Sequence, residues 1–139
     1  MADRSPAQLY ARVIGLSLVA AGVLGFFYSG DFRAPGKVDD AFGILSVNGW
    51  HNVVHLVTGA LGLALAGRRD PARAYAGGLG VVYLVVAVWG IALGAHGSIL
   101  GFLPVNSEDD VLHVLLAVLG LAAAALSHEP RRLKPRFAP

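Results

Sequence analysis

The 139-residue chain has no cysteine and few charged residues, and each shortage narrows what it can be. Without cysteine, disulfide bonds and thiolate chemistry are both excluded. Only 14% of the residues are charged and 55% are hydrophobic, whereas an average soluble domain has roughly 25% charged residues. The mean hydropathy is +0.62. The composition therefore indicates a protein that lies in lipid.

Charged residues are absent from four long stretches, at residues 13–30, 53–67, 74–95 and 111–127. With their polar ends, each approaches the roughly 20 residues that a helix needs to cross a bilayer core of about 30 Å. The sequence therefore predicts an all-α integral membrane four-helix bundle, formed by one domain over residues 1–139. The expected spans are about 8–29, 48–67, 74–95 and 107–127, followed by a basic tail at 128–139.

The basic residues concentrate in three of the five segments outside these stretches. Arginine and lysine prevail at the N-terminus, at residues 68–73 and in the tail, whereas acidic residues prevail at 31–40 and 108–110. By the positive-inside rule, both termini and the middle connection are expected in the cytoplasm. The tail then lies against anionic headgroups, and nucleic-acid binding is not expected. We expect a multi-pass protein of the bacterial inner membrane.

An internal repeat organises the chain. Residues 43–67 align without a gap on residues 101–125, which lie 58 positions later. The identical pairs include Asn48/Asn106 and His55/His113. Each half contains two spans, so both halves have the same orientation, and a twofold axis along the membrane normal is expected. The predicted bundle therefore consists of two parallel two-helix repeats.

The starts of the second and fourth spans follow capping patterns. Asn48 or Ser46 is expected to cap the second span, and Ser107 followed by acidic residues resembles a capping box at the start of the fourth. His55 and His113 then lie about two turns inside the outer end. Both belong to a predicted polar cluster of His51, Asn52, His55, Asp110 and His113.

A stripe of small residues accompanies each of these two histidines on its helix. Such stripes allow membrane helices to approach closely, so we expect the second and fourth spans to pack on each other across the twofold axis. The predicted packing residues are Gly59, Gly62, Ala66, Ala117, Gly120 and Ala124.

The buried imidazoles require hydrogen-bond partners. Reciprocal pairs, His55 with Asp110 and His113 with Asn52, would supply them without any cofactor. Two alternatives use the same atoms. His51, His55, His113 and Asp110 could bind zinc or copper, or His55 and His113 could ligate haem or a chlorin pigment.

Three classes of function remain open, and no arrangement of residues indicates an enzyme. The favoured class is a structural or accessory subunit, which contacts other membrane subunits or a second copy through Gly90 and Gly94, a GxxxG pattern. The second is a haem-, pigment- or metal-binding protein that uses His55 and His113. The third is a channel or transporter for small solutes, although no polar path across the membrane is visible.

A doubled motif resembles a family of small four-span bacterial membrane proteins catalogued as a domain of unknown function. Its copies here are Asn52-Val-Val-His55 with Gly62-Leu63, and Asp110-Val-Leu-His113 with Gly120-Leu121. The likeness extends from Ala11 to about Ser127. It implies a four-helix membrane domain and brings no activity or ligand. Ala117 stands where the first copy has Gly59, which is a mild departure.

Overall fold

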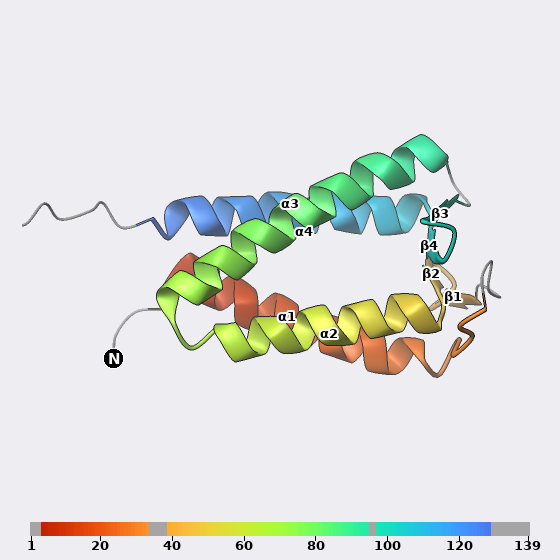
Figure 1. Ribbon diagram of the computed structural model, residues 1–139, viewed down its shortest axis with the longest axis horizontal. Coiled ribbons are helices and arrows are strands. Elements are labelled where there is room, and N and C mark those ends of the chain that lie inside the picture. Colours follow the sequence, from red (N-terminus) through yellow and green to blue (C-terminus); the bar gives the residue numbers. More distant parts are fainter. Residues whose placement is uncertain (1–3, 34–38, 95–96, 129–139) are drawn as a thin grey trace, which may run out of the picture.

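The computed structural model describes residues 4–33, 39–94 and 97–128, which form helices and two short hairpins (Figure 1). The helices are α1 (Pro6–Gly25), α2 (Gly49–Leu65), α3 (Arg69–Leu93) and α4 (Ser107–Leu126). The strands are β1 (Asp39–Ala41), β2 (Leu45–Val47), β3 (Gly97–Ile99) and β4 (Leu103–Val105). The predicted mostly helical fold with four helices is confirmed for these residues, and the hairpins were not predicted. Nearly all of the predicted basic tail lies outside the described ranges.

The connections between the helices divide between two ends of the molecule. The starts of α1 and α3 and the end of α4 lie at one end, and both hairpins lie at the other (Figure 1). Each hairpin joins its strands in the same antiparallel register, with Asp39 opposite Val47 and Gly97 opposite Val105. We call these the terminal end and the hairpin end.

Asparagine side chains fix where α2 and α4 begin. Asn48 accepts a hydrogen bond from the His51 backbone N–H at 2.9 Å, and Asn106 accepts one from the Asp109 N–H at 2.8 Å. These bonds satisfy N–H groups that the first turn of a helix leaves without a partner. The predicted cap at Asn48 is confirmed, whereas α4 is capped by Asn106 and not by Ser107.

The small-residue stripes do not join α2 to α4, so that predicted contact is wrong. Instead α1 packs along α2, and α3 packs along α4. A Cβ added at Gly59 would lie 2.7 Å from the Gly15 carbonyl oxygen of α1, and one at Gly120 would lie 2.7 Å from the Ala76 carbonyl oxygen of α3. Ala66 and Ala117 are also buried. The second and the fourth span therefore each pack on the helix that precedes them in the chain.

Glycines on α1 and α3 explain this choice of partner. A Cβ at Gly22 would lie 2.7 Å from the Asn52 carbonyl oxygen, and one at Gly80 would lie 2.9 Å from the Leu121 nitrogen. A Cβ at Gly77 would make an ordinary contact with Ala124 at 3.4 Å. Close helix contact requires small residues on both surfaces, and α1 and α3 supply the second surface.

Two tyrosines hold the α1/α2 pair against the α3/α4 pair toward the terminal end. The Tyr75 hydroxyl donates to the Thr58 carbonyl oxygen at 3.0 Å, and the Tyr10 hydroxyl donates to the Leu116 carbonyl oxygen at 2.9 Å. The two ring centroids are 6.4 Å apart. Each tyrosine hydroxyl thus donates to a helix of the other pair, and the bond gives the hydroxyl a partner in an apolar core.

The hairpin end is held by an exchange of hydrogen bonds between the two pairs. The side-chain amide of Asn48 donates to the Phe102 carbonyl oxygen at 2.7 Å, and that of Asn106 donates to the Ile44 carbonyl oxygen at 2.8 Å. Both asparagines are buried. Each one therefore caps its own helix and also fixes the hairpin of the other pair.

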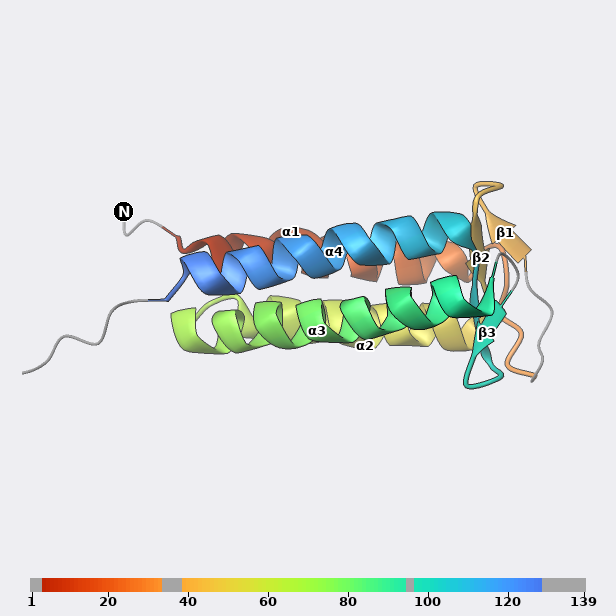
Figure 2. The same ribbon diagram turned by 90° about the horizontal axis from the view of Figure 1, so that it is seen from above.

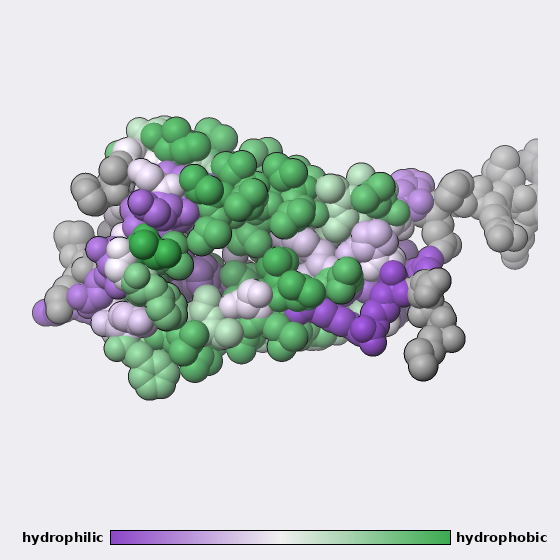
Figure 3. Space-filling model, turned by 180° about the vertical axis from the view of Figure 1, so that it is seen from behind, coloured by the Kyte–Doolittle hydropathy of each residue, from purple (hydrophilic) through white to green (hydrophobic). Residues whose placement is uncertain are grey.

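The outward faces of the helices are apolar. Among the described residues, α1, α3 and α4 are long and apolar enough to cross a membrane, and α2 has 17 residues. Hydrophobic residues cover most of the middle of the face shown in Figure 3, and hydrophilic residues gather toward its two ends. This surface suggests a lipid bilayer environment.

Candidate functional site

His51 lies in the first turn of α2 with its ring orientation fixed. Its Nδ1 atom is 2.9 Å from the Ser46 carbonyl oxygen. Because a carbonyl oxygen only accepts hydrogen bonds, Nδ1 carries the proton, and Nε2 of the neutral ring presents a lone pair. This is the arrangement of many metal-binding histidines, whose second nitrogen donates to a carbonyl group.

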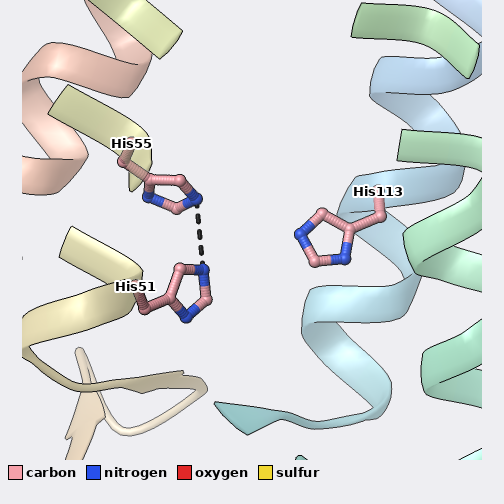
Figure 4. A group of neighbouring side chains, drawn as sticks. All are labelled: His51, His55 and His113. Atoms are coloured by element: carbon pink, nitrogen blue, oxygen red, sulfur yellow. Dashed lines mark hydrogen bonds between the residues drawn. The ribbon is translucent and has the colours of Figure 1, made fainter. Parts of the chain in front are cut away.

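His55 follows one turn later on the same face of α2. Its Nε2 atom is 3.1 Å from Nε2 of His51, and the ring centroids are 4.4 Å apart (Figure 4). Since His51 presents a lone pair there, His55 donates its Nε2 proton when no ion is bound. The predicted pairing of His55 with Asp110 is therefore wrong, because its partner lies on its own helix.

His113 approaches the pair from α4, on the other side of the site (Figure 4). Its ring stacks on Tyr83 of α3, with centroids 5.2 Å apart and an interplanar angle of 19°. The residue is buried, and its Nδ1 atom has no hydrogen-bond partner within the described ranges. The predicted bond between His113 and Asn52 is not formed, since the Asn52 amide donates to the Ser29 carbonyl oxygen at 2.8 Å.

The three imidazoles border a cavity of about 70 Å³ between the two helix pairs. One ligand nitrogen from each of His51, His55 and His113 lies within 4.8 Å of the others. The rest of the lining is mostly apolar and comes from α2, α3 and the second hairpin: Val54, Thr58, Leu79, Val82, Tyr83, Val86, Ile99, Leu103, Pro104 and Val105. The site is therefore a small apolar chamber with three convergent nitrogen ligands.

These nitrogens fit a transition-metal ion. With Zn–N bonds of about 2.05 Å, the 3.1 Å between Nε2 of His51 and of His55 corresponds to an angle of roughly 100° at the ion. A tetrahedral ion holds its ligands about 3.3 Å apart. Since the His113 nitrogen lies within 4.8 Å of the other two, it needs to move by at most roughly 1.5 Å. It would move into the cavity that it already lines.

Haem and chlorin do not fit this site. Pockets for drug-sized organic ligands have volumes of roughly 300–1,000 Å³, and this cavity has about 70 Å³. A macrocycle between His55 and His113 would require the two helix pairs to separate. The cavity accommodates an ion with one or two small ligands.

Asn52 and Asp110 occupy equivalent places outside the chamber. Asn52 Oδ1 packs against Gly25 of α1, and Asp110 Oδ1 packs against Gly90 of α3. Neither oxygen has a hydrogen-bond partner among the residues that the structure describes. The structure thus brings His51, His55 and His113 of the predicted polar cluster together and places the other two against neighbouring helices.

The predicted partner face at Gly90 and Gly94 is not a free surface. Gly90 is buried beneath Asp110. Gly94 is exposed and ends α3 with a positive φ of 84°. The GxxxG spacing here reflects one internal contact and one helix end.

Sequence reasoning missed the roles of Ser46 and Tyr83. Ser46 was expected only as an alternative cap, but its carbonyl oxygen orients His51. Its N–H donates to Asp109 at 3.1 Å, which links the first hairpin to α4. Tyr83 stacks on His113. Its position on α3 carried no signal for stacking on a histidine, because it has no counterpart in the first half.

These features define a class, that of small helical proteins with apolar outer helix faces suited to a membrane. Within it, the chain belongs to the family described as a domain of unknown function, DUF4383, whose family model matches residues 8–126. No curated protein and no solved structure matches the chain. The family match confirms the resemblance at that level and assigns no activity, so the function must be argued from the site.

Proposed function

We propose that this protein is a four-span membrane protein that binds one transition-metal ion at His51, His55 and His113. The observation that supports this most strongly is the convergence of three imidazole nitrogens within 4.8 Å at a cavity. Buried polar groups without partners are costly in an apolar surrounding. An ion would take the place of the proton that His55 donates to His51 and would draw His113 into the same set of bonds.

The proposed orientation places the terminal end in the cytoplasm of a bacterium and the hairpin end outside. Arg68, Arg69 and Arg73 lie around the turn between α2 and α3, at the terminal end (Figure 1), and Glu108 lies at the hairpin end. This distribution follows the positive-inside rule. Helix α2 runs beside α1, so its 17 residues, about 25 Å at 1.5 Å per residue, cross nearly the same layer.

We also propose that the two helix pairs are repeats of one unit, related by an axis along the membrane normal. The supporting contacts recur with a constant offset. Gln8 donates to the Ala66 carbonyl oxygen at 3.2 Å, and Arg73 donates to that of Ala124 at 3.0 Å. The acceptors differ by 58 positions, as do those of the tyrosine bonds. In such a repeat His55 and His113 are equivalent, and Asp109 takes the place of His51.

Zinc and copper are the metals that best suit this site. Neutral imidazole is a borderline ligand that binds zinc, copper, iron and nickel, whereas magnesium and calcium prefer oxygen ligands. Three protein ligands leave a fourth position for water or another small ligand, as in zinc sites that have an open coordination position. The apolar lining would keep the ion out of bulk water.

The other two classes of function stay predictions. An accessory subunit would need a docking surface, and the burial of Gly90 against Asp110 removes half of the one that was expected. A transporter would need a polar path, and the cavity at the histidines is lined mainly by apolar side chains. The metal-binding proposal is favoured because the structure supplies its ligands.

Metal titration of the purified protein tests the proposal. Protein stripped with a chelator is titrated with Co²⁺, whose visible absorption reports four-coordinate binding, and with Zn²⁺ in competition. We expect one ion per chain. His51→Gln, His55→Gln and His113→Gln should each weaken binding by more than about 100-fold, beyond the 10–100-fold effect typical of outer-shell partners.

The matched control is His128→Gln, because His128 is exposed and lies at the opposite end. It should bind like the wild type. The proposal is wrong if the wild-type protein binds no ion, or if its binding survives replacement of all three histidines. Circular dichroism of each variant shows whether the helices are retained.

A further inference from the structure

Both hairpins carry a large apolar residue in a backbone conformation that such residues rarely adopt. Phe42 has φ of 56° and is followed by Gly43 at 73°, and Leu100 has φ of 54° and is followed by Gly101 at 78°. Two consecutive residues with positive φ form the tight turn for which Asn-Gly is preferred. A bulky side chain is strained at the first position. In both turns, a large apolar residue therefore stands where asparagine is preferred.

The strained side chains are not packed in the protein interior. Phe42 is 62% exposed and Leu100 is 65% exposed, and Ile44 beside the first turn is 53% exposed. Strain of this kind persists where something else in the surroundings offsets it. Contacts within the chain leave more than half of each of these side chains uncovered, so each turn offers a large apolar side chain to a contact outside the chain.

The two turns project sideways beyond the helices. Figure 2 shows the β1–β2 hairpin extending past α1 and α4, and the β3–β4 hairpin extending in the opposite direction past α2 and α3. In the proposed orientation, both turns therefore lie above lipid and not above the bundle. They sit at the level where the helices leave the hydrocarbon core.

Aromatic residues mark the same level. The rings of Tyr28 and Phe42 are 5.2 Å apart, those of Phe32 and Trp50 are 5.3 Å apart, and Trp50 and Phe102 are 5.7 Å apart. Belts of aromatic side chains occupy the boundary between headgroups and hydrocarbon in membrane proteins. Phe42 and Phe102 connect each hairpin to this belt.

The first hairpin also overhangs an apolar hollow on the side of α4. The hollow has a volume of about 360 Å³ and lies between Ile44 and Leu45 of the hairpin and Val111 and Leu112 of the helix. Ser107 and Glu108 form its polar edge. The hollow is continuous with the exposed apolar face of α4. In the proposed orientation lipid covers that face, and the same lipid can fill the hollow.

We propose that the turns at Phe42 and Leu100 insert into the outer leaflet of the bilayer, at the headgroup boundary. The bilayer is the partner that fits because the two turns point in opposite directions, and lipid surrounds the molecule on both sides. This inference rests on the membrane orientation proposed above and is independent of the metal site. The turns would act as two lateral anchors that fix the depth of the hairpin end.

The absence of cysteine makes a direct test possible, because each introduced cysteine is unique. Phe42→Cys and Leu100→Cys carry a nitroxide label, and the protein is reconstituted in phosphatidylcholine nanodiscs without other proteins. Spin relaxation then compares collisions with oxygen, which partitions into lipid, and with a nickel chelate, which stays in water. Asp40→Cys, on the exposed part of β1, is the water control. Val88→Cys, which replaces an exposed residue of α3, is the lipid control.

We expect the oxygen-to-nickel ratio at both turns to exceed that at Asp40 several-fold and to approach that at Val88. Ratios at the turns equal to that at Asp40, together with a lipid-like ratio at Val88, would overturn this inference alone. A water-like ratio at Val88 would overturn the membrane orientation and this inference with it. Neither result depends on whether the protein binds metal.

Discussion

Replacing Gly59 by alanine should destabilise the protein, although alanine is the better helix former. A Cβ at this position would lie 2.7 Å from both the Gly15 carbonyl oxygen and the Val19 nitrogen, whereas ordinary contacts begin at 3.4 Å. Both atoms belong to the backbone of α1, so α1 and α2 would have to separate by about 0.7 Å. Overpacking of this kind costs roughly 1–3 kcal/mol.

Gly78→Ala is the matched control, because a Cβ at Gly78 meets nothing within 4 Å. In Gly78→Ala no overpacking opposes the gain in helix propensity of about 1 kcal/mol, so this variant should be more stable than the wild type. At Gly59 the same gain offsets part of the overpacking, and the close backbone contacts favour the upper part of its range. We expect a net loss of about 1–2 kcal/mol, so the two variants differ by about 2–3 kcal/mol.

Unfolding in mixed micelles, followed by circular dichroism as the fraction of sodium dodecyl sulfate rises, measures both free energies of unfolding. A difference of 2.8 kcal/mol corresponds to about 100-fold in the unfolding equilibrium constant. If Gly59→Ala is as stable as Gly78→Ala, then α1 and α2 do not pack at the distance described, and the pairing of the helices must be revised.

The remaining predictions use the same unfolding assay. Tyr10→Phe and Tyr75→Phe should each lower the free energy of unfolding by about 0.6 kcal/mol, and by no more than about 1.7 kcal/mol, the range for interhelical hydrogen bonds in membranes. The losses of these two variants should agree closely, and a loss in only one of them would contradict the equivalence of Tyr10 and Tyr75. Tyr28→Phe, at an exposed tyrosine, is the control. Asp109→Ala leaves two buried N–H groups without their acceptor, at a cost of about 1–3 kcal/mol each. The neighbouring Glu108→Ala should cost far less because Glu108 is exposed, and equal losses would refute the role of Asp109.

The helices could be predicted from the sequence because their signals are local. Charge-free runs of the right length and the asparagine at the start of α2 depend only on neighbouring residues. The expected start at residue 48 and the observed N-cap at Asn48 agree for this reason. The fourth span also begins at residue 107 as expected, but its N-cap is Asn106 and not Ser107. Both are good capping residues, and only the local geometry selects between them.

The choice of helix partners could not be predicted in the same way. A stripe such as Gly59 and Gly62 shows that a helix is approached closely, but it does not identify the approaching helix. The complementary glycines at Gly15 and Gly22 were present in the sequence, and they are the signal that could have indicated α1. The matched histidines His55 and His113 instead favour a contact between α2 and α4, because only those helices carry them.

The histidine cluster was predicted in part. Spacing alone placed His51 and His55 on one face of a helix, and the repeat indicated that His113 would be equivalent to His55. Their convergence depends on the distance between the two helix pairs, to which the long-range bonds of Tyr10 and Tyr75 and the exchanged asparagine bonds all contribute. The stacking of His113 on a ring from α3 depends on the same distance.

The exchanged asparagine bonds at the hairpin end have a consequence for how the chain could have arisen. Asn48 reaches the hairpin of the second helix pair, and Asn106 reaches that of the first. This reciprocity is that of an isologous dimer, in which the same surface of two subunits meets itself. Two copies of a shorter protein with one hairpin and two helices could form both of these bonds. Joining the C-terminus of one copy to the N-terminus of the other would then give a chain of this kind. In a dimer of identical subunits, both would carry the same residue at the position of His51. A single chain with two halves can instead carry His51 in one half and Asp109 at the equivalent position of the other.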